Sequence, residues 1–204
     1  MMDNINDLLA EMEQYAVIHN VPIINREGAQ LLQQTTATAN PCSILEIGTA
    51  IGYSTLLLAA NMAGNGKITT IELDEQRLNM AKQFLMRAGI LDKIEFIAGN
   101  AGEVLSRLHG NFDFVFIDAA KGQYLDYLSK VMDKLSPGAI VIADNVLFRG
   151  WVLSSQSAPR RFRTIVKRLN AYLDFVCNDT RFETVVHQIG DGMAISHYQG
   201  DTKI

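Results

Sequence analysis

Residues 43–54 read SILEIGTAIGYS, a strand-like run followed by two spaced glycines and the start of a helix. The strand-like run is almost continuously apolar, which is typical of a strand covered on both faces in a parallel sheet. Gly48 stands where the backbone must turn sharply and approach a ligand closely. The helix that follows opens with free backbone amides and the positive end of its dipole. The segment therefore predicts a strand, a tight binding turn and a helix.

The same alternation continues on both sides of this segment. Strand-like runs lie at 67–73, 93–99, 112–118 and 139–144, and helical patterns lie near 52–63, 75–89, 101–108, 122–135 and 160–176. Such alternation is typical of an α/β fold with a parallel sheet. Upstream, residues 3–39 read as two helices separated at 19–22. Downstream, the runs 182–189 and 192–199 follow each other across Gly190-Asp191, which predicts an antiparallel β-hairpin.

We therefore expect a Rossmann-like three-layer sandwich of the α/β class. Its mostly parallel seven-stranded sheet should end in the hairpin, whereas a dehydrogenase fold continues with a second mononucleotide-binding half. The length of 204 residues suits a single domain, with residues 1–40 as a helical extension and 43–199 as the core. Hydrophobic residues make up 48% and charged residues 20% of the chain, as in ordinary soluble proteins.

Charge and cysteine usage limit the function and the location. The formal net charge of −4 argues against a protein that coats nucleic acid over its whole surface, but it leaves room for a local basic patch. No apolar run reaches the roughly 18 residues of a membrane span, and the acidic N-terminus is unlike a signal or transit peptide. We therefore expect a cytoplasmic protein without a membrane partner. Cys42 and Cys177 stand far apart, which predicts packed thiols rather than a disulfide.

The spacing in residues 46–52 distinguishes this turn from a dinucleotide-binding loop. A dinucleotide loop has the pattern G-x-G-x-x-G, whereas the pattern here is E-x-G-x-x-x-G, without the middle glycine. Glu46 would repel a pyrophosphate but suits, directly or through water, a ligand that carries an ammonium group. Glu72 ends the second strand near the place where an acid binds ribose hydroxyls, and small residues at 99–102 end the third, where an adenine can lie. One such feature is as often structural, but three at successive strand ends predict a nucleoside cofactor.

Acidic side chains end the fourth and fifth strands. Asp118 closes the run FDFVFID, and Asp144 closes AIVIAD and is followed by Asn145. Because parallel neighbours end at the same edge of a sheet, we expect these three oxygen ligands to converge beside the cofactor and to hold a hard cation such as Mg²⁺. Either aspartate alone would more simply cap the following helix or loop. Lys121 follows Asp118 closely, so its amine can act as a base at the same rim, or else be a solvated residue at a helix start.

Together these motifs resemble the metal-dependent O-methyltransferases of the catechol and caffeoyl-CoA type, over roughly residues 22–199. LEIGTAIGYS is similar to that family's cofactor loop, FIDAAKGQY to its metal-and-lysine strand end, and ADNV to its second metal strand. The resemblance implies a homodimer that uses S-adenosylmethionine, with a divalent cation on Asp118, Asp144 and Asn145 and with Lys121 as the catalytic base. The residues that it implies against S-adenosylmethionine are Ile24, Glu46, Gly48, Ser54, Glu72, Ala101 and Asp118.

The methyl acceptor is the open part of this hypothesis. The catechol enzymes carry bulky residues between the metal aspartate and the lysine, whereas Ala119 and Ala120 stand here and leave room for a larger acceptor. The VPI stretch and the ILEIGTAIGYS loop resemble the bacterial branch that methylates hydroxyuridine in tRNA. In hydroxyuridine, the hydroxyl and the ring carbonyl present two oxygens at catechol-like spacing, so both can bind one metal ion.

A basic segment lies directly after the predicted metal strand. From Asn145 to Leu173 the chain has no acidic residue, and the basic residues there are Arg149, Arg160, Arg161, Arg163, Lys167 and Arg168. They either contact RNA phosphates near the active site or form an ordinary solvated helix face. Three other functions remain as alternatives. A catechol methyltransferase would share every site residue, an NAD-binding oxidoreductase is disfavoured by the missing glycine and the hairpin, and a non-catalytic binding protein would not need Lys121 or the metal ligands.

Overall fold

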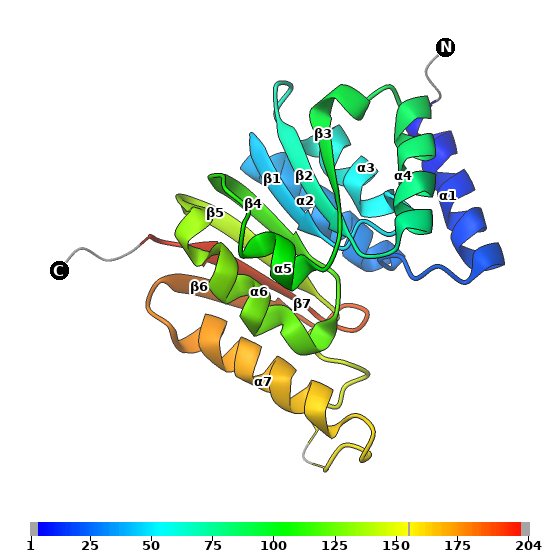
Figure 1. The fold of residues 1–204 in the computed structure, drawn as a ribbon. Helices are drawn as coiled ribbons and strands as arrows, with labels where there is room; N and C mark the ends of the chain where they lie inside the picture. Colours follow the sequence, from blue (N-terminus) through cyan, green and yellow to red (C-terminus); the bar gives the residue numbers. More distant parts are fainter. Residues whose placement is uncertain (1–3, 155, 201–204) are drawn as a thin grey trace.

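The computed structural model describes residues 4–154 and 156–200. Its strands are β1 (Ser43–Ile47), β2 (Lys67–Glu72), β3 (Ile94–Ala98), β4 (Phe112–Ile117), β5 (Leu135–Asp144), β6 (Phe182–His187) and β7 (Met193–Tyr198). They form one seven-stranded sheet in the order β3-β2-β1-β4-β5-β7-β6 (Figure 1). Strands β1 to β5 pair in parallel, and β7 pairs antiparallel with both β5 and β6. The predicted Rossmann-like sheet with its terminal antiparallel hairpin is confirmed.

Helices cover both faces of the sheet and make a three-layer sandwich. One layer consists of α1 (Ile5–His19), α2 (Arg26–Ala39), α3 (Tyr53–Asn61) and α4 (Glu75–Arg87). The other consists of α5 (Ala101–Leu105), α6 (Tyr124–Val131) and α7 (Arg163–Asn178). Figure 1 shows the two layers on opposite sides of the twisted sheet.

The apolar strand runs divide their side chains between these two layers. Successive residues of a strand point to opposite faces. In β4, Phe114 and Phe116 pack with the layer of α1 to α4, whereas Val115 and Ile117 pack with α5 to α7. All four side chains are fully buried. This is why the strand is apolar at every position and shows no period-two polarity.

The sheet reverses its order beside β1, and this reversal positions the site. The chain passes from β1 outward to β2 and β3, then returns to the other side of β1 to build β4 and β5. In parallel sheets, ligands bind outside the carboxyl ends of the strands at such a switch point. The turns that follow β1, β2, β4 and β5 therefore meet around one place.

Several predicted boundaries are wrong by a few residues. The predicted helix over 122–135 is α6 alone, flanked by 3₁₀ turns at 121–123 and 132–134. The short helix predicted to 108 ends at Leu105, and the last helix begins at Arg163 rather than at 160. Residues 160–161 lie in a turn, because the N–H of Phe162 donates to the carbonyl of Pro159 at 2.7 Å. The hairpin strands are shortened by the five-residue loop 188–192, with Gly190-Asp191 at its turn.

Cys42 and Cys177 are free thiols, as predicted, but both are exposed rather than packed. Cys42 directly precedes β1 and Cys177 lies in the last turn of α7, so neither reaches the core. In the described ranges, 4–154 and 156–200, no helix combines the length and the apolar character needed to cross a membrane.

Candidate active site

A cavity of about 340 Å³ opens at the carboxyl edge of the sheet, where β1, β2 and β4 end. Its walls come from the turns after these strands, from the turns after β3 and β5, and from the segment between α1 and α2. Predicted site residues that line it are Ile24, Gly48, Ser54, Glu72, Ala101, Asp118, Lys121 and Asn145. Segments that are far apart in the sequence thus contribute to one cavity. Glu46 and Asp144 are the two predicted residues that do not line it.

The turn after β1 is held against the neighbouring strands. The N–H of Gly48 donates to the carbonyl of Ile71 at 2.9 Å. Gly48 has φ of 105°, and a Cβ at this position would overlap the backbone carbonyl of Asp118. Glycine is therefore required at position 48 for two reasons: its backbone is left-handed, and the carbonyl of Asp118 after β4 approaches it closely.

Glu72 organises the rim of the cavity as well as lining it. Its Oε2 accepts from the N–H of Ala50 at 2.8 Å, and its Oε1 accepts from the N–H of Asp74 at 2.9 Å. Ala50 has φ of 45°, a left-handed conformation that this hydrogen bond helps to hold. The carboxylate remains half-buried at the cavity wall, so it can also accept from a ligand's hydroxyls.

Glu46 lies beneath the cavity rather than on its wall. Its fully buried carboxylate accepts hydrogen bonds from the hydroxyls of Ser54, Thr55 and Thr70 at 2.5–2.6 Å. Burial raises the pKa of Glu46 to about 7, and the three hydroxyls oppose that rise. Ser54 lines the cavity, so Glu46 reaches the cavity through Ser54.

The two acids at the ends of β4 and β5 share an electrostatic environment. Burial raises the pKa of Asp118, and the charge of Lys121 opposes this. For Asp144, burial first and the charge of Asp118 second raise the pKa to about 7, while the N–H of Asn145 and the charge of Lys121 oppose the rise. The structure thus brings Asp118, Asp144 and Lys121 within electrostatic reach of one another, as their strand-end positions predicted.

Asp144 carries a buried polar atom that the described residues do not satisfy. Its Oδ1 accepts from the N–H of Asn145 at 2.7 Å, and its backbone carbonyl accepts from the hydroxyl of Tyr124 at 2.9 Å. Its Oδ2 is buried and has no hydrogen-bond partner among the residues that the structure describes. A buried unpaired carboxylate oxygen costs about 1–3 kcal/mol or more. The carboxylate of Asp118, the Oδ2 of Asp144 and the side-chain amide oxygen of Asn145 make a set of oxygen ligands that fits a hard divalent cation.

The described ranges contain no group of three or more His, Cys, Asp and Glu side chains that could hold a metal ion. The predicted ligand set differs from such a group, because it combines the carboxylates of Asp118 and Asp144 with the side-chain amide of Asn145. Asn145 has φ of 56°, a left-handed conformation in which its side chain lines the cavity next to Asp144. The fit therefore depends on the orphaned oxygen of Asp144 and on the position of Asn145.

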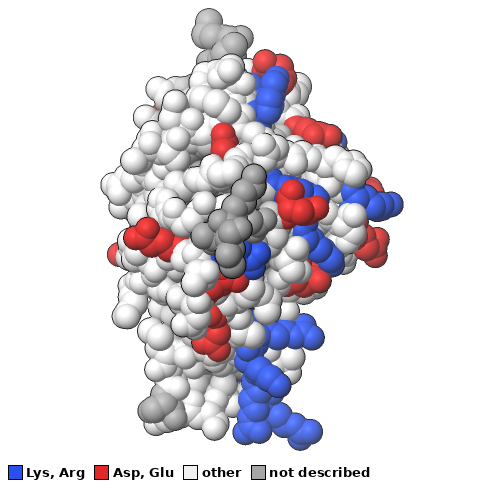
Figure 2. Space-filling model, turned by 90° about the vertical axis from the view of Figure 1, so that its left-hand side faces the viewer, with Lys and Arg blue, Asp and Glu red and all other residues white. Residues whose placement is uncertain are grey.

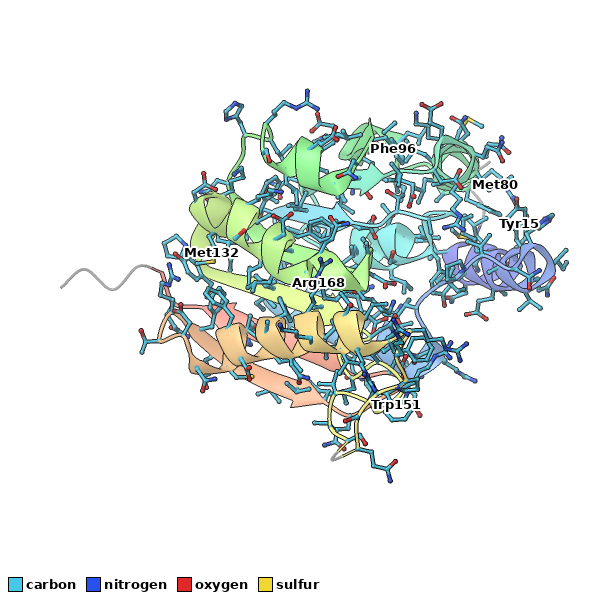
Figure 3. All side chains as sticks on the ribbon, turned by 60° about the horizontal axis from the view of Figure 1, so that its bottom comes forward. Tyr15, Met80, Phe96, Met132, Trp151 and Arg168 are labelled. Carbon is cyan, nitrogen blue, oxygen red and sulfur yellow. The ribbon has the colours of Figure 1, made fainter. Side chains whose placement is uncertain are left out.

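Lys121 belongs to a 3₁₀ turn that α7 supports from outside. The turn spans Lys121–Gln123, and the Nη1 of Arg168 donates to the carbonyl of Gly122 at 3.2 Å. A Cβ at Gly122 would lie 3.3 Å from that Nη1, so the guanidinium packs tightly on the turn. Figure 3 shows Arg168 on the side of α7 that faces α6. Arg168 thus fixes the backbone next to Lys121.

Sequence reasoning missed several residues of the cavity wall. Tyr53 directly precedes the predicted Ser54 and Leu73 directly follows the predicted Glu72, whereas Arg77, Gln123 and Tyr127 lie within the first turn or so of the elements that follow the strands. The hydroxyl of Tyr53 also donates to Glu13 of α1 at 2.6 Å, which ties the first helix to the cofactor turn. Adjacency to a strand-end turn is the signal that would have found the first two. The other three depend on how the helices pack.

Known proteins similar to this chain include O-methyltransferases. The model of a family described as O-methyltransferase matches residues 3–198. A relative, caffeoyl-CoA O-methyltransferase 5 of Nicotiana tabacum, is 29% identical over 202 residues, which cover 92% of this chain and 82% of the relative. A Staphylococcus aureus structure, named as a candidate caffeoyl-CoA O-methyltransferase, is 33% identical with a TM-score of 0.85, covering 93% of this chain and 91% of that one. A Bacillus cereus O-methyltransferase in complex with SAH is 26% identical with a TM-score of 0.84, covering 94% and 90%.

Proposed function

The chain belongs to the O-methyltransferase family and is an S-adenosylmethionine-dependent O-methyltransferase, and from this premise we propose its metal and its acceptor. We propose that it uses a divalent cation such as Mg²⁺ to methylate one of two neighbouring oxygens. We further propose that the acceptor is hydroxyuridine in tRNA. The observation that carries the metal is the buried Oδ2 of Asp144, which lies within electrostatic reach of Asp118 and has no hydrogen-bond partner in residues 4–154 and 156–200. The proposal assigns the cation to Asp118, Asp144 and Asn145, and proton removal to Lys121.

One cavity supports the assignment of the cofactor residues. Glu72 at its wall suits ribose hydroxyls, and Ala101 at the start of α5 leaves space for an adenine. Ser54, hydrogen-bonded to Glu46, suits the polar end of the methionine part. Ile24 gives an apolar wall near the same end. We assign Ile24, Glu46, Gly48, Ser54, Glu72, Ala101 and Asp118 to S-adenosylmethionine, with Glu46 acting through Ser54.

The chemistry divides into proton removal and methyl transfer. A bound divalent cation would make the acceptor hydroxyl a stronger acid and neutralise the acids around it. Lys121 takes the hydroxyl proton on Nζ. The acceptor oxygen then forms a bond to the methyl carbon while the bond from that carbon to the sulfonium sulfur breaks, and S-adenosylhomocysteine leaves. Arg168 and the turn at 121–123 hold Lys121 in position, and positioning of the reacting atoms supplies much of the acceleration.

The acceptor is proposed from space and from charge. Ala119 and Ala120 both line the cavity, so the wall between Asp118 and Lys121 is built from small side chains. The basic residues between β5 and the middle of α7 are exposed. Two of them, Arg163 and Arg168, also donate hydrogen bonds to backbone carbonyls. Figure 2 shows Lys and Arg side chains gathered without acidic neighbours at the lower end of the molecule, at the height of α7 in Figure 1. We also propose that the protein is cytoplasmic, as its sequence predicts, and that it forms a homodimer.

A small catechol-like acceptor is the second candidate, because the relatives quoted above are named for caffeoyl-CoA. Mass spectrometry of tRNA nucleosides from a strain that lacks this protein separates the two. We expect hydroxyuridine to accumulate in place of its methylated form, and the purified protein should restore the methyl group only with a divalent ion. Full activity after exhaustive EDTA treatment would overturn the metal. Unchanged tRNA together with robust methylation of a catechol would favour the small molecule.

A further inference from the structure

The loop between β5 and α7 holds an unusual backbone conformation close to the site. Phe148 has φ of 43° and Arg149 has φ of 57°, left-handed values that bulky side chains rarely adopt. The loop of the β6–β7 hairpin fixes this conformation. The N–H of Leu147 donates to the carbonyl of Asp191, and the N–H of Arg149 donates to Asp191 Oδ1, both at 2.8 Å. Such strain persists only where surrounding contacts determine it, and it is common at functional sites.

Two arginines from different parts of this loop converge on one ring. The guanidinium carbon of Arg161 lies 4.5 Å from the ring centroid of Phe162, and that of Arg149 lies 5.5 Å from it. Phe148 packs edge-on against the same ring, with centroids 5.3 Å apart. Cation–π contact holds each guanidinium without neutralising its charge. The ring thus presents two oriented cations.

Both guanidiniums remain available to a ligand. Arg149 and Arg161 are exposed, and neither forms an ion pair with a carboxylate of residues 4–154 or 156–200. Other arginines of the segment have structural contacts, because Arg163 Nε donates to the carbonyl of Ala158 and Arg168 donates to Gly122. The first turn of α7 contains no acidic residue. The carboxylate of Asp191 lies near the cluster because it accepts from the backbone N–H of Arg149, but no described carboxylate forms an ion pair with either guanidinium.

The cluster also lies near the predicted metal ligands. Phe148 N–H donates to the carbonyl of Asn145 at 3.3 Å, so a single turn separates Asn145 from Arg149. At the other end, Arg168 contacts the turn of Lys121, and Arg163 lies about 7.5 Å before it along the axis of α7. An acceptor placed at the cavity mouth would therefore bring its flanking groups to this cluster.

We infer that Arg149 and Arg161, held on the ring of Phe162, form a phosphate-binding subsite for the RNA backbone beside the modified nucleotide. This inference rests on the proposed tRNA acceptor and adds which arginines bind it and how they are held. Planar guanidiniums suit phosphate oxygens because they donate paired hydrogen bonds. Further exposed cations, Arg160 and Lys167, extend the positive surface beyond these two, which suits a chain of phosphates better than one small anion. Leu153 is the one strongly exposed large hydrophobic residue of the described segment 146–154 and 156–170, which disfavours a protein partner.

The test measures binding of tRNA at several salt concentrations to the wild type and three variants. Arg149→Gln/Arg161→Gln removes both cations. Phe162→Leu keeps both charges but removes the ring that orients them. Arg107→Gln removes an exposed charge next to α5, away from the basic segment, and serves as the matched control. Titration with S-adenosylhomocysteine checks that each variant retains its cofactor site.

We expect the double variant to bind RNA on the order of tenfold more weakly, with the slope of log affinity against log salt reduced by about 0.7 for each lost contact. Phe162→Leu should bind severalfold more weakly with a nearly unchanged slope, since the charges remain. Arg107→Gln should match the wild type. If both cluster variants bind RNA like Arg107→Gln while the wild type still methylates tRNA, the subsite is wrong and the proposed function stands.

Two competitors identify the source of the phosphate. If poly-L-glutamate of matched charge displaces labelled RNA with the same efficiency as unlabelled RNA, the inference is overturned in favour of an acidic protein surface. In the second competition, the contrary result is that coenzyme A displaces RNA from the wild type and not from the double variant, with the same affinity for RNA in both proteins. That result would overturn the inference in favour of a coenzyme A thioester acceptor. Absence of RNA binding and of tRNA methylation in the wild type would instead reject the proposed acceptor itself.

Discussion

Two buried carboxylates at the carboxyl edge of the same sheet differ in how many hydrogen-bond donors surround them. Glu46 in β1 and Asp144 in β5 are both almost fully enclosed, and burial is the main cause that raises each pKa to about 7. Glu46 has three hydroxyl donors for its two oxygens. Asp144 has one amide donor for Oδ1 and none for Oδ2 among the described residues.

The difference separates the cofactor half of the site from the acceptor half. At Glu46 and Glu72 the protein supplies hydrogen-bond donors of its own, so this half is organised before a ligand arrives. At Asp144 the fold buries an acid beside another acid and leaves one oxygen without a donor among the described residues, which favours either a bound proton or a cation from outside the chain. A cation at Asp144 would stabilise the buried negative charge of this carboxylate, as the three hydroxyl donors do at Glu46.

Removal of Asp144 should break the acceptor half most severely. In Asp144→Ala we expect turnover to fall on the order of a thousandfold, because the charge of the transition state loses its stabilisation, while S-adenosylmethionine still binds. Steady-state kinetics and calorimetric titration measure the two effects. Asp133→Ala, which changes an exposed acid on the turn after α6, is the matched control and should be silent. Equal loss of cofactor binding and turnover would contradict the division into two halves.

Gly48→Ala tests how rigidly the cofactor half is built. The added Cβ would meet the backbone carbonyl of Asp118 in a residue with φ of 105°, so we expect a loss of about 3 kcal/mol in the free energy of unfolding, together with weakened cofactor binding. Chemical denaturation measures the first effect. Gly138→Ala has φ of 83° but no heavy atom within 4 Å of the new Cβ, so it should lose only about 1 kcal/mol. Similar losses for both variants would show that packing against Asp118 contributes nothing.

The raised pKa of Asp144 predicts how stability changes with pH. Its folded pKa of about 7 lies above the ordinary value of 3.8, so the folded protein binds the proton more tightly than the unfolded chain does. That stabilisation is complete below pH 4 and is lost as the pH rises toward 7. In the metal-free protein, Asp144→Asn should therefore be more stable than the wild type at pH 8, on the order of 2 kcal/mol, and equal to it near pH 4. Magnesium ions should stabilise only the wild type, and thermal melts that show no such difference would remove Asp144 from the metal site.

Glu72→Ala sharpens the comparison from the cofactor side. We expect S-adenosylmethionine to bind more weakly by about 1–3 kcal/mol, since ribose hydroxyls lose a charged acceptor and the amide of Ala50 loses its partner. Calorimetric titration gives the affinity directly. Glu75→Ala, an exposed acid in the first turn of α4, is the control. An affinity equal to that of the control would take Glu72 out of the cofactor site.

The smallest expected effect is at Arg168. Loss of its hydrogen bond to Gly122 should loosen the turn of Lys121, so we expect Arg168→Ala to lower kcat about three- to tenfold with the KM for S-adenosylmethionine unchanged. Lys167→Ala removes a charge of the same sign from the neighbouring exposed position and should leave kcat intact. A change in KM for RNA alone, equal in both variants, would reduce Arg168 to one more surface charge.

The local pattern predicted elements well and their ends poorly. Apolar runs near 43–48 and 112–118 predicted β1 and β4 because a strand covered on both faces cannot hide polar residues. The end of the run 101–108 and the start of the helix near 160 depend on individual turns, such as the hydrogen bond from Phe162 to Pro159, which periodicity does not show. The five-residue hairpin loop likewise shortened both strands beyond what the pattern indicated.

By itself the sequence determined the α/β class, the order of strands and helices, and the polar residues that end each strand, since these follow from hydrophobic period and from turn chemistry. Only the tertiary structure decided which of those residues share a surface. It buried Glu46 among hydroxyls, left the Oδ2 of Asp144 without a partner in the described part of the chain, and brought Arg149 and Arg161 onto one ring. Hydrogen-bond satisfaction and ring contacts join residues that are distant in the chain, so they arise from packing and have no local signal.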